Sequence, residues 1–152
     1  MGKQSAGILL YRRAGGKLQV FLVHPGGPFF RNKDDGSWSI PKGEFLENED
    51  PLQAAIREFE EEIGEHITGE FVQLNPIKQK GGKTVQAWAI AGDIDHTTIK
   101  SNHFEIEWPP RSGKMQSFPE VDRAEWFDAD TAKIKINAAQ AALIEELIEH
   151  DL

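Results

Sequence analysis

The 152-residue chain contains no cysteine. A disulfide framework and a thiolate metal site are therefore excluded, so any bound metal must use oxygen or imidazole ligands. The five histidines show no H-x3-H spacing, and a zinc site is not expected. They are His24, His66, His96, His103 and His150. For His24, which precedes the segment PGGPFF, we expect a surface position rather than one facing a pocket.

Long hydrophobic runs are also missing. The longest apolar stretches, such as AGILLY and VFLV, are much shorter than the ~20 residues that a membrane span requires. No basic-then-apolar signal segment opens the sequence. We therefore expect a cytoplasmic protein without a membrane partner.

Positive charge is scarce, because 17 lysines and arginines stand against 25 aspartates and glutamates, which gives a net charge of −8. Long-range electrostatics then repel polyanions, so duplex nucleic acid is not an expected partner. If the substrate is phosphorylated, cations must intervene between it and the protein.

What the chain does contain is typical of one globular domain spanning residues 1–152. Hydrophobic residues make up 39% and charged residues 28% of the sequence, which is far from the composition of disordered proteins. This length is sufficient to bury roughly two-thirds of the unfolded surface.

Several segments have the composition of strands. Residues 5–13 and 18–24 predict a hairpin with its turn at 14–17, and WSIP (38–41) predicts a short strand after a surface loop at 25–37. Further strands are expected in 70–79, 83–92 and 124–129. The Pro- and Gly-containing segment from about 93 to 119 predicts a long connection.

Two segments have helical periodicity. In residues 50–63, Leu52, Ile56, Phe59 and Ile63 share an apolar stripe, Asp50 precedes the helix as its cap, and glycine at 64 ends it. Residues 137–149 predict a terminal amphipathic helix with Asn137 as its cap.

Four glutamates crowd the last turns of the first predicted helix: Glu58, Glu60, Glu61 and Glu62. Glu58 lies three and four residues before Glu61 and Glu62, so these side chains converge and repel by roughly 0.2–0.5 kcal/mol per pair. They also lie near the helix C-terminus, where the macrodipole favours cations.

The acidic turn is open to three interpretations. A solvated acidic face would be the ordinary one, and a calcium loop is disfavoured because the D-x-[DN]-x-[DN]-G pattern is missing. Arg57 can pair with Glu61 four residues on, and the Gly-bearing loop IPKGEFLENE can fold back beside the helix. Converging carboxylate oxygens favour Mg²⁺ or Mn²⁺, completed by water and substrate phosphates.

The same stretch resembles the Nudix box, G-x5-E-x7-R-E-U-x-E-E-x-G-U, where U is aliphatic. Seven positions of fixed identity match within 22 residues: Gly43, Glu49, Arg57, Glu58, Glu61, Glu62 and Gly64. At the two U positions the chain departs from the pattern with Phe59 and Glu65.

The resemblance implies an α/β fold, the Nudix-type α/β/α sandwich with a mixed sheet between helices. It also implies hydrolysis of a nucleoside diphosphate linked to another group, by water attack at phosphorus with divalent metals. Glu58, Glu61 and Glu62 would be metal ligands, and Glu58 or a carboxylate outside the box would be the base.

The resemblance gives further roles to other residues of the box. Arg57 would orient the carboxylates, with Glu61 also in the catalytic group, and Glu49, Gly43 and Gly64 would support the site. Outside the box, Glu120 stands six residues before Trp126. In the branch of the family that cleaves diadenosine polyphosphates, a glutamate at the same distance before the closing tryptophan lies near the metals. Glu120 is therefore an expected extra ligand, or else a loop acid beside Pro119.

Substrate-binding residues are less well specified. Six cationic side chains lie in or beside loops: Lys42, Lys78, Lys80, Lys83, Arg31 and Arg111. Of these, Lys42 and Lys83 are the expected substrate contacts. Candidate rings for base stacking are Phe29, Phe30, Phe104 and Trp108, whereas Trp38, Trp88 and Trp126 are expected in the core. The only tyrosine is Tyr11, so a late adenine-stacking tyrosine is missing.

We therefore expect an enzyme, a Nudix pyrophosphohydrolase that binds a small nucleotide, with a dinucleoside polyphosphate or a nucleoside triphosphate as the leading substrates. Alternatives are hydrolysis of nucleotide sugars, dinucleotide cofactors or RNA caps, and a non-catalytic module that senses a nucleotide. The sensor would be expected to have lost box glutamates, and this chain retains them. The leaving group, the number of metals and the oligomeric state stay open.

Overall fold

The computed structural model describes residues 3–150. Within these residues, seven strands form one sheet and two more form a separate hairpin. The main sheet contains β1 (Gln4–Ala14), β2 (Lys17–Pro25), β3 (Lys42–Glu44), β4 (Val72–Gln73), β5 (Ile77–Lys78), β6 (Thr84–Ala91) and β9 (Val121–Asp128). The hairpin contains β7 (His103–Glu107) and β8 (Met115–Pro119).

The main sheet is mixed. Its strands run in the order β4-β6-β1-β2-β9, with β3 paired to β1 and β5 paired to β6. The pairing of β1 with β6 is parallel and places Ile8 opposite Trp88, whereas the other pairings are antiparallel. The predicted first hairpin is confirmed, with Ala14 opposite Lys17 at its turn.

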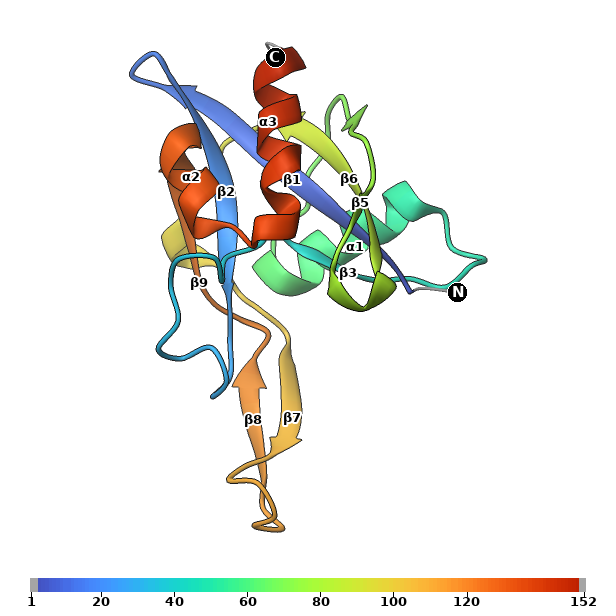
Figure 1. The fold of residues 1–152 in the computed structure, drawn as a ribbon, viewed down its shortest axis with the longest axis vertical. Coiled ribbons are helices and arrows are strands. Elements are labelled where there is room, and N and C mark those ends of the chain that lie inside the picture. Colours follow the sequence, from blue (N-terminus) through green and yellow to red (C-terminus); the bar gives the residue numbers. More distant parts are fainter. Residues whose placement is uncertain (1–2, 151–152) are drawn as a thin grey trace.

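Helices cover both faces of this sheet (Figure 1). The α-helices are α1 (Pro51–Ile63), α2 (Ala129–Lys135) and α3 (Ala141–His150). Three short 3-10 turns accompany them: η1 (Lys80–Gly82), η2 (His96–Thr98) and η3 (Ala138–Gln140). None of the helices in the described part of the chain is long and apolar enough to cross a membrane.

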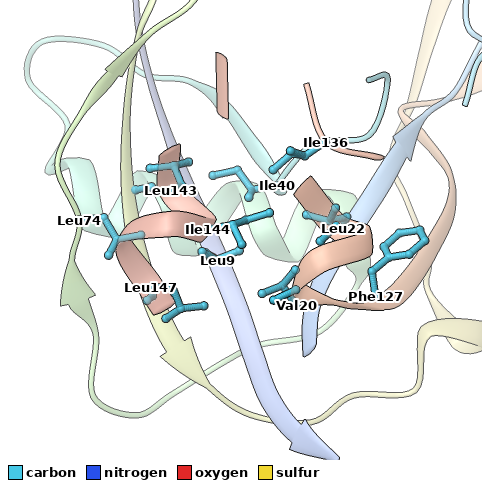
Figure 2. Close-up of a cluster of buried hydrophobic side chains, with 14 of the residues drawn as sticks. Leu9, Val20, Leu22, Ile40, Leu74, Phe127, Ile136, Leu143, Ile144 and Leu147 are labelled. Atoms are coloured by element: carbon cyan, nitrogen blue, oxygen red, sulfur yellow. The ribbon is translucent and has the colours of Figure 1, made fainter. Parts of the chain in front are cut away.

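Two apolar cores lie on opposite faces of β1, because successive side chains of a strand point to opposite sides. Ile8 and Leu10 pack with Phe59 of α1, while Leu9 packs with Leu143 of α3. Figure 2 shows the second core, where α3 meets β1 and β2. The expected α/β/α sandwich with a mixed sheet is therefore confirmed.

The predicted long connection between residues 93 and 119 is wrong in part. It contains β7 and β8, which extend away from the main sheet as an arm (Figure 1). Phe104 and Phe118 stand opposite each other across the two strands, with ring centroids 6.1 Å apart. Residues 103–107, HFEIE, alternate between polar and apolar side chains as a strand does. The many polar residues around them and Pro109-Pro110 favoured the interpretation as a connection instead.

The expected strand at WSIP is also wrong. Trp38 and Ser39 form isolated bridges to Ile136 and Val23, and the regular strand is β3, inside the segment expected to be a loop. Glycine at 43 pairs with Ala6 on β1 there. A three-residue strand paired on one side has too few residues to show a period, so only its partner reveals it.

The C-terminal prediction holds in outline. Asn137 caps a helical turn as expected, accepting a hydrogen bond from the Ala139 backbone N–H at 2.9 Å, but that turn is the 3-10 element η3 and α3 follows it. Helix α2 was not predicted, because its sequence ADTAKIK has one short apolar stripe. The last strand, expected at 124–129, occupies 121–128 as β9.

Candidate active site

Helix α1 begins and ends where the sequence predicts. The Asp50 side chain accepts a hydrogen bond from the Gln53 backbone N–H at 3.1 Å, and Pro51 occupies the first turn. At the other end, Gly64 has a φ of 84°, a left-handed conformation that favours glycine, and its N–H donates to the Glu60 backbone carbonyl at 2.7 Å. The box helix is therefore fixed at both ends.

The glutamates of α1 do not form a solvated face. Glu58 and Glu62 are each only 9% exposed, although Glu60 on the same helix is exposed. Phe59, at a position where the Nudix box has an aliphatic residue, is fully buried and lies against Phe21 with ring centroids 6.3 Å apart. Burial of Phe59 against the sheet draws its neighbour Glu58 inward.

Arg57 holds three carboxylates together. Its Nη1 donates to Glu58 at 3.0 Å and to Glu61 at 3.1 Å, so the predicted pairing with Glu61 is confirmed. Its Nη2 donates to both oxygens of Glu49, at 3.2 and 3.1 Å. Glu49 in turn accepts from the Leu46 backbone N–H at 3.2 Å. This network fixes the loop before α1 to the acidic end of the helix.

Gly43 allows β3 to approach the helix closely. A Cβ atom at this position would lie 2.1 Å from the Glu58 carboxyl carbon. Real side chains do not tolerate such a distance, so any larger residue would displace Glu58 or β3. The first position of the box must therefore be glycine so that Glu58, 15 residues later, can pack against it.

Burial and like charge raise the pKa values of these carboxyls. For Glu62, burial is the main cause and the charges of Glu58 and Glu120 add to it, giving a pKa of about 8. Burial also raises the pKa of Glu58, with the Glu61 charge second and Arg57 opposing. Neutral acids or bound cations are the two ways to relieve such a cluster.

Glu120 lies beside this cluster, as the resemblance to the Nudix family led us to expect. It stands between β8 and β9, where its backbone N–H donates to Asn102 at 2.8 Å and its carbonyl accepts from Gly26 at 2.9 Å. Burial raises the pKa of Glu120, and the charge of Glu61 adds to the effect. Four carboxylates therefore share one electrostatic environment although only three come from α1.

The chemistry of this donor set fits a divalent cation. Among residues 3–150, no three acidic or histidine side chains lie at spacings that would enclose an ion. Mg²⁺ does not require such a cage, because it binds through one or two carboxylates and keeps waters or phosphate oxygens as its other ligands. Glu62 and Glu120, which both border an open cleft, meet that requirement.

The cleft has a volume of about 290 Å³ and is lined by residues from several elements. Glu62, Glu120 and Lys42 form its charged part, whereas Glu58 and Glu61 do not line it. Of the six candidate cations, Lys42 is the one that borders the cleft among the described residues. The acidic cluster and the cleft therefore meet at Glu62.

Lys42 and Lys83 lie on the same side of the site. Burial lowers the pKa of Lys42, and the nearby charge of Lys83 lowers it further, while Glu62 opposes both effects. The Lys42 backbone N–H also donates to the Glu62 carboxylate. Lys83 forms an ion pair with Glu44 at 3.7 Å. Lys83 lies near the cleft without lining it.

The candidate stacking rings are separated by the fold. Phe30 lines the cleft, whereas Phe29 packs edge-on against Trp108 of the arm, with ring centroids 5.3 Å apart. Phe104 is paired with Phe118. Phe30 is therefore the aromatic ring among these candidates that can meet a ligand in the cleft.

The burial of His24 differs from the expected position, whereas the tryptophans lie largely as predicted. His24 is fully buried, so the expected surface position is wrong; its Nδ1 lies 2.8 Å from Asp122 and its Nε2 donates to the Lys33 carbonyl at 2.7 Å. A single histidine at a strand end carries no signal for such tertiary partners. Trp38 and Trp88 are in the core as predicted, and Trp126 is partly buried.

Sequence reasoning missed two amides that line the cleft, Gln79 and Gln140. Gln140 is buried and accepts from the Ile40 backbone N–H at 3.0 Å, and its Nε2 donates to Ser39 at 3.0 Å. This bridge joins the C-terminal segment to the chain before β3. Glutamine is common on protein surfaces, so the sequence offered no signal for either position.

Comparison with known proteins agrees with this geometry. The NUDIX domain family profile matches residues 1–147. The chain is 30% identical over 114 residues to the asymmetrical bis(5'-nucleosyl)-tetraphosphatase of Caenorhabditis elegans, which covers 69% of this chain and 77% of that protein. It is also 30% identical over 97 residues to the m7GpppN-mRNA hydrolase of Saccharomyces cerevisiae, covering 62% of this chain and 8% of that protein.

Solved structures show the same fold. The NUDIX domain of Shewanella oneidensis NrtR in complex with ADP ribose matches with a TM-score of 0.68 at 17% identity, over 100% of this chain and 90% of that chain. A binary complex of the C. elegans Ap4A hydrolase matches with a TM-score of 0.64 at 23% identity, over 96% of both chains. The chain therefore belongs to the Nudix family and is a Nudix pyrophosphohydrolase.

Proposed function

We propose that this protein hydrolyses a phosphoanhydride bond in a nucleoside diphosphate-linked substrate, with a dinucleoside polyphosphate or a nucleoside triphosphate as the first candidate, and that it requires Mg²⁺ or Mn²⁺. The observation that carries the proposal is the burial of Glu58 and Glu62, two acids that repel neighbouring carboxylates and of which Glu62 borders an open cleft. A packed protein gains nothing from this arrangement unless a cation and its ligand complete it.

The proposed metal ligands are Glu58, Glu61, Glu62 and Glu120. A bound divalent ion would stabilise charge on the phosphate oxygens and acidify a water molecule. It would also offset the net charge of −8 that otherwise repels a polyphosphate. Glu58 is the proposed base inside the box, and Glu120 is the alternative outside it.

The roles proposed for the supporting residues follow from their contacts. Arg57 fixes the Oε1 atoms of Glu58 and Glu61 at hydrogen-bond distance, which holds the two carboxylates in one orientation. Glu49 keeps Arg57 in place from the other side. Without this guanidinium, the side chains would separate under their mutual repulsion.

On the substrate side, Lys42 is proposed to contact phosphate oxygens, and its position at the charged end of the cleft close to Glu62 supports this role. Lys83 is proposed to add to the positive potential there, since it influences Lys42 from outside the cleft. A phosphate group between the lysines and a divalent ion would be neutralised from two sides.

The decisive experiment is a substrate panel with Mg²⁺ or Mn²⁺, comprising diadenosine tetraphosphate, ATP, a nucleotide sugar and capped RNA, with products identified by chromatography. We expect cleavage of a dinucleoside polyphosphate or triphosphate that stops on addition of a chelator. The Glu60→Gln variant, altered at an exposed glutamate of the same helix, is the control and should retain activity. Tight binding of one compound without cleavage of any would favour a nucleotide sensor instead.

A second candidate function is hydrolysis of an RNA cap. The chain is 56% identical over 43 residues to the mRNA-decapping protein g5R of African swine fever virus, although this match covers only 28% of the chain. Release of m7GDP from capped RNA at a rate above that of diadenosine tetraphosphate cleavage would make this the primary activity. A rate far below it would leave the first proposal in place.

A further inference from the structure

The cleft has an uncharged part as well as the charged part already described. Phe30, Gln79, Asn137 and Gln140 all line it, and none of them carries a charge. Gln79 directly follows β5, which packs beside η3, the element next to Asn137 and Gln140. An aromatic ring and three amides are typical of a surface that binds a flat polar ring rather than a phosphate.

Most of these amides are already occupied. Asn137 Oδ1 accepts from the Ala139 backbone N–H, and Gln140 is bonded at both ends of its amide to Ser39 and Ile40. Gln79 differs, because its Oε1 is buried and has no hydrogen-bond partner. In residues 3–150 the other such side-chain atom is Ser5 Oγ, which lies on β1 and does not line the cleft.

The backbone of Gln79 is held firmly while its side-chain oxygen is left unpaired. Its N–H donates to the Lys83 carbonyl at 2.8 Å, and its own carbonyl accepts from the Gly82 N–H at 3.2 Å. The terminal side-chain bond of glutamine rotates over a broad range, so the amide can turn toward the cleft. A buried acceptor without a donor is unfavourable, and a ligand that supplied the donor would relieve it.

Phe30 is positioned by a buried anchor. The Lys33 N–H donates to the Phe30 carbonyl at 3.0 Å, and the Lys33 carbonyl accepts from His24 Nε2 at 2.7 Å. Since His24 is fully buried, this turn of the loop is attached to the protein interior. Phe30 thus borders the cleft on a fixed segment, with Lys33 Nζ 5.4 Å from the centroid of its ring, and a ring held in this way favours stacking of a planar group.

We propose that the uncharged part of the cleft is a nucleobase subsite in which Gln79 recognises adenine and Phe30 provides the stacking surface. Adenine offers an amine donor at N6 beside an acceptor at N7, and a glutamine amide pairs with both at once. Guanine presents acceptors at the same positions, so it would leave Gln79 Oε1 facing another acceptor. The subsite deepens the proposed function, on which it rests for the use of this cleft by a nucleotide.

The test compares binding of methylene-bridged analogues of ATP and GTP, which resist hydrolysis, to the whole protein with Mg²⁺ by calorimetry. The original protein should bind the adenine analogue about tenfold more tightly than the guanine analogue. Gln79→Leu should remove this preference by weakening adenine binding alone. Gln73→Leu, altered at an exposed glutamine of β4, is the control and should keep it.

Kinetics provide a second readout where hydrolysis occurs. Gln79→Leu should raise KM for adenosine substrates while kcat stays within a factor of about two, because in this assignment the Gln79 side chain contacts the base and not the reacting phosphates. If Gln79→Leu does not fold, judged by circular dichroism, Gln79→Asn shortens the side chain by one methylene and serves in its place.

The possible outcomes separate the two proposals. No preference for adenine in the original protein, or a preference that survives both substitutions of Gln79, overturns the subsite whatever the hydrolytic activity. A preference that disappears with Gln79→Leu supports the subsite even if no phosphoanhydride is cleaved, in which case only the proposed hydrolysis fails.

Discussion

Helices α1 and α3 cover opposite faces of the same sheet and bury different kinds of side chain. From α3, the buried residues are Leu143, Ile144 and Leu147, which are all apolar. From α1, Glu58 and Glu62 are buried together with apolar residues such as Phe59. Burial of apolar surface stabilises a fold, whereas burial of neighbouring carboxylates opposes it. The comparison therefore separates a helix that serves stability from one whose buried carboxylates we propose to serve chemistry.

The largest expected effect comes from removing one charge on α1. Glu62→Gln should lower kcat by about a hundredfold or more, because this carboxylate borders both the cleft and the acidic cluster. The melting temperature of the metal-free protein should stay equal at neutral pH, because a pKa of about 8 keeps the Glu62 carboxyl mostly protonated there. Above about pH 8 the original carboxyl ionises, so the variant should then melt at a higher temperature than the original protein. Kinetics and thermal melts on the same samples measure both, and a large loss of stability would contradict the separation.

A large effect is also expected from a substitution on α3, but on stability rather than on activity. Leu143→Ala should lower the free energy of unfolding by about 2–5 kcal/mol through lost burial and a cavity in the second core. Activity per folded molecule should be retained. Urea titration gives the stability, and Ile148→Ala on the exposed side of the same helix is the control, with a change under about 1 kcal/mol.

A smaller steric change tests how closely β3 and α1 must approach. Gly43→Ala places a Cβ against the Glu58 carboxylate, so we expect activity to fall about a hundredfold or less while the fold persists. Gly92→Ala is the control at the opposite end of the sheet, where the added Cβ meets a movable Leu10 methyl group. Equal activity of both variants would show that the position of Glu58 is not critical.

The smallest expected effect is a pH-dependent one far from the acidic cluster. The pKa of Asp34 is lowered by hydrogen bonds from Lys135 first and Trp38 second. A carboxyl with a lower pKa in the folded state adds stability above its unfolded value and loses it as the pH falls through the folded value. Asp34→Asn should therefore lower the melting temperature slightly at pH 7 and not in strong acid.

Asp35→Asn is the matched control for this measurement, because Asp35 pairs with Lys135 at 3.0 Å whereas the Trp38 indole donates to Asp34. Its melting temperature should change less than that of Asp34→Asn at pH 7. A difference between the original protein and Asp34→Asn that persisted unchanged below pH 3 would contradict the assigned cause.

Local patterns predicted the parts of the fold that local physics controls. The apolar stripe with Asp50 and Gly64 at its ends specified α1, and the runs of strand-forming residues on either side of residues 14–17 specified the first hairpin. The box spacing also identified which glutamates converge, because neighbours three and four residues apart on a helix meet whatever surrounds them.

Other elements depended on partners distant in the sequence. Strand β3 exists because β1 supplies its hydrogen bonds, and β7 and β8 stabilise each other across a segment that resembles a loop. His24 is buried because Asp122 and Lys33 satisfy its ring nitrogens. None of these partners can be inferred from the residues next to the element itself.

The sequence by itself determined the helix that carries the glutamates, its caps and the chemical class of the metal ligands that we propose, because helical geometry and carboxylate chemistry are local properties. Only the tertiary structure decided that Glu58 and Glu62 are buried and that Glu120 shares their environment. It also decided that Gln79 and Phe30 border the same cleft. Burial and proximity result from packing between distant segments, and no local pattern encodes them.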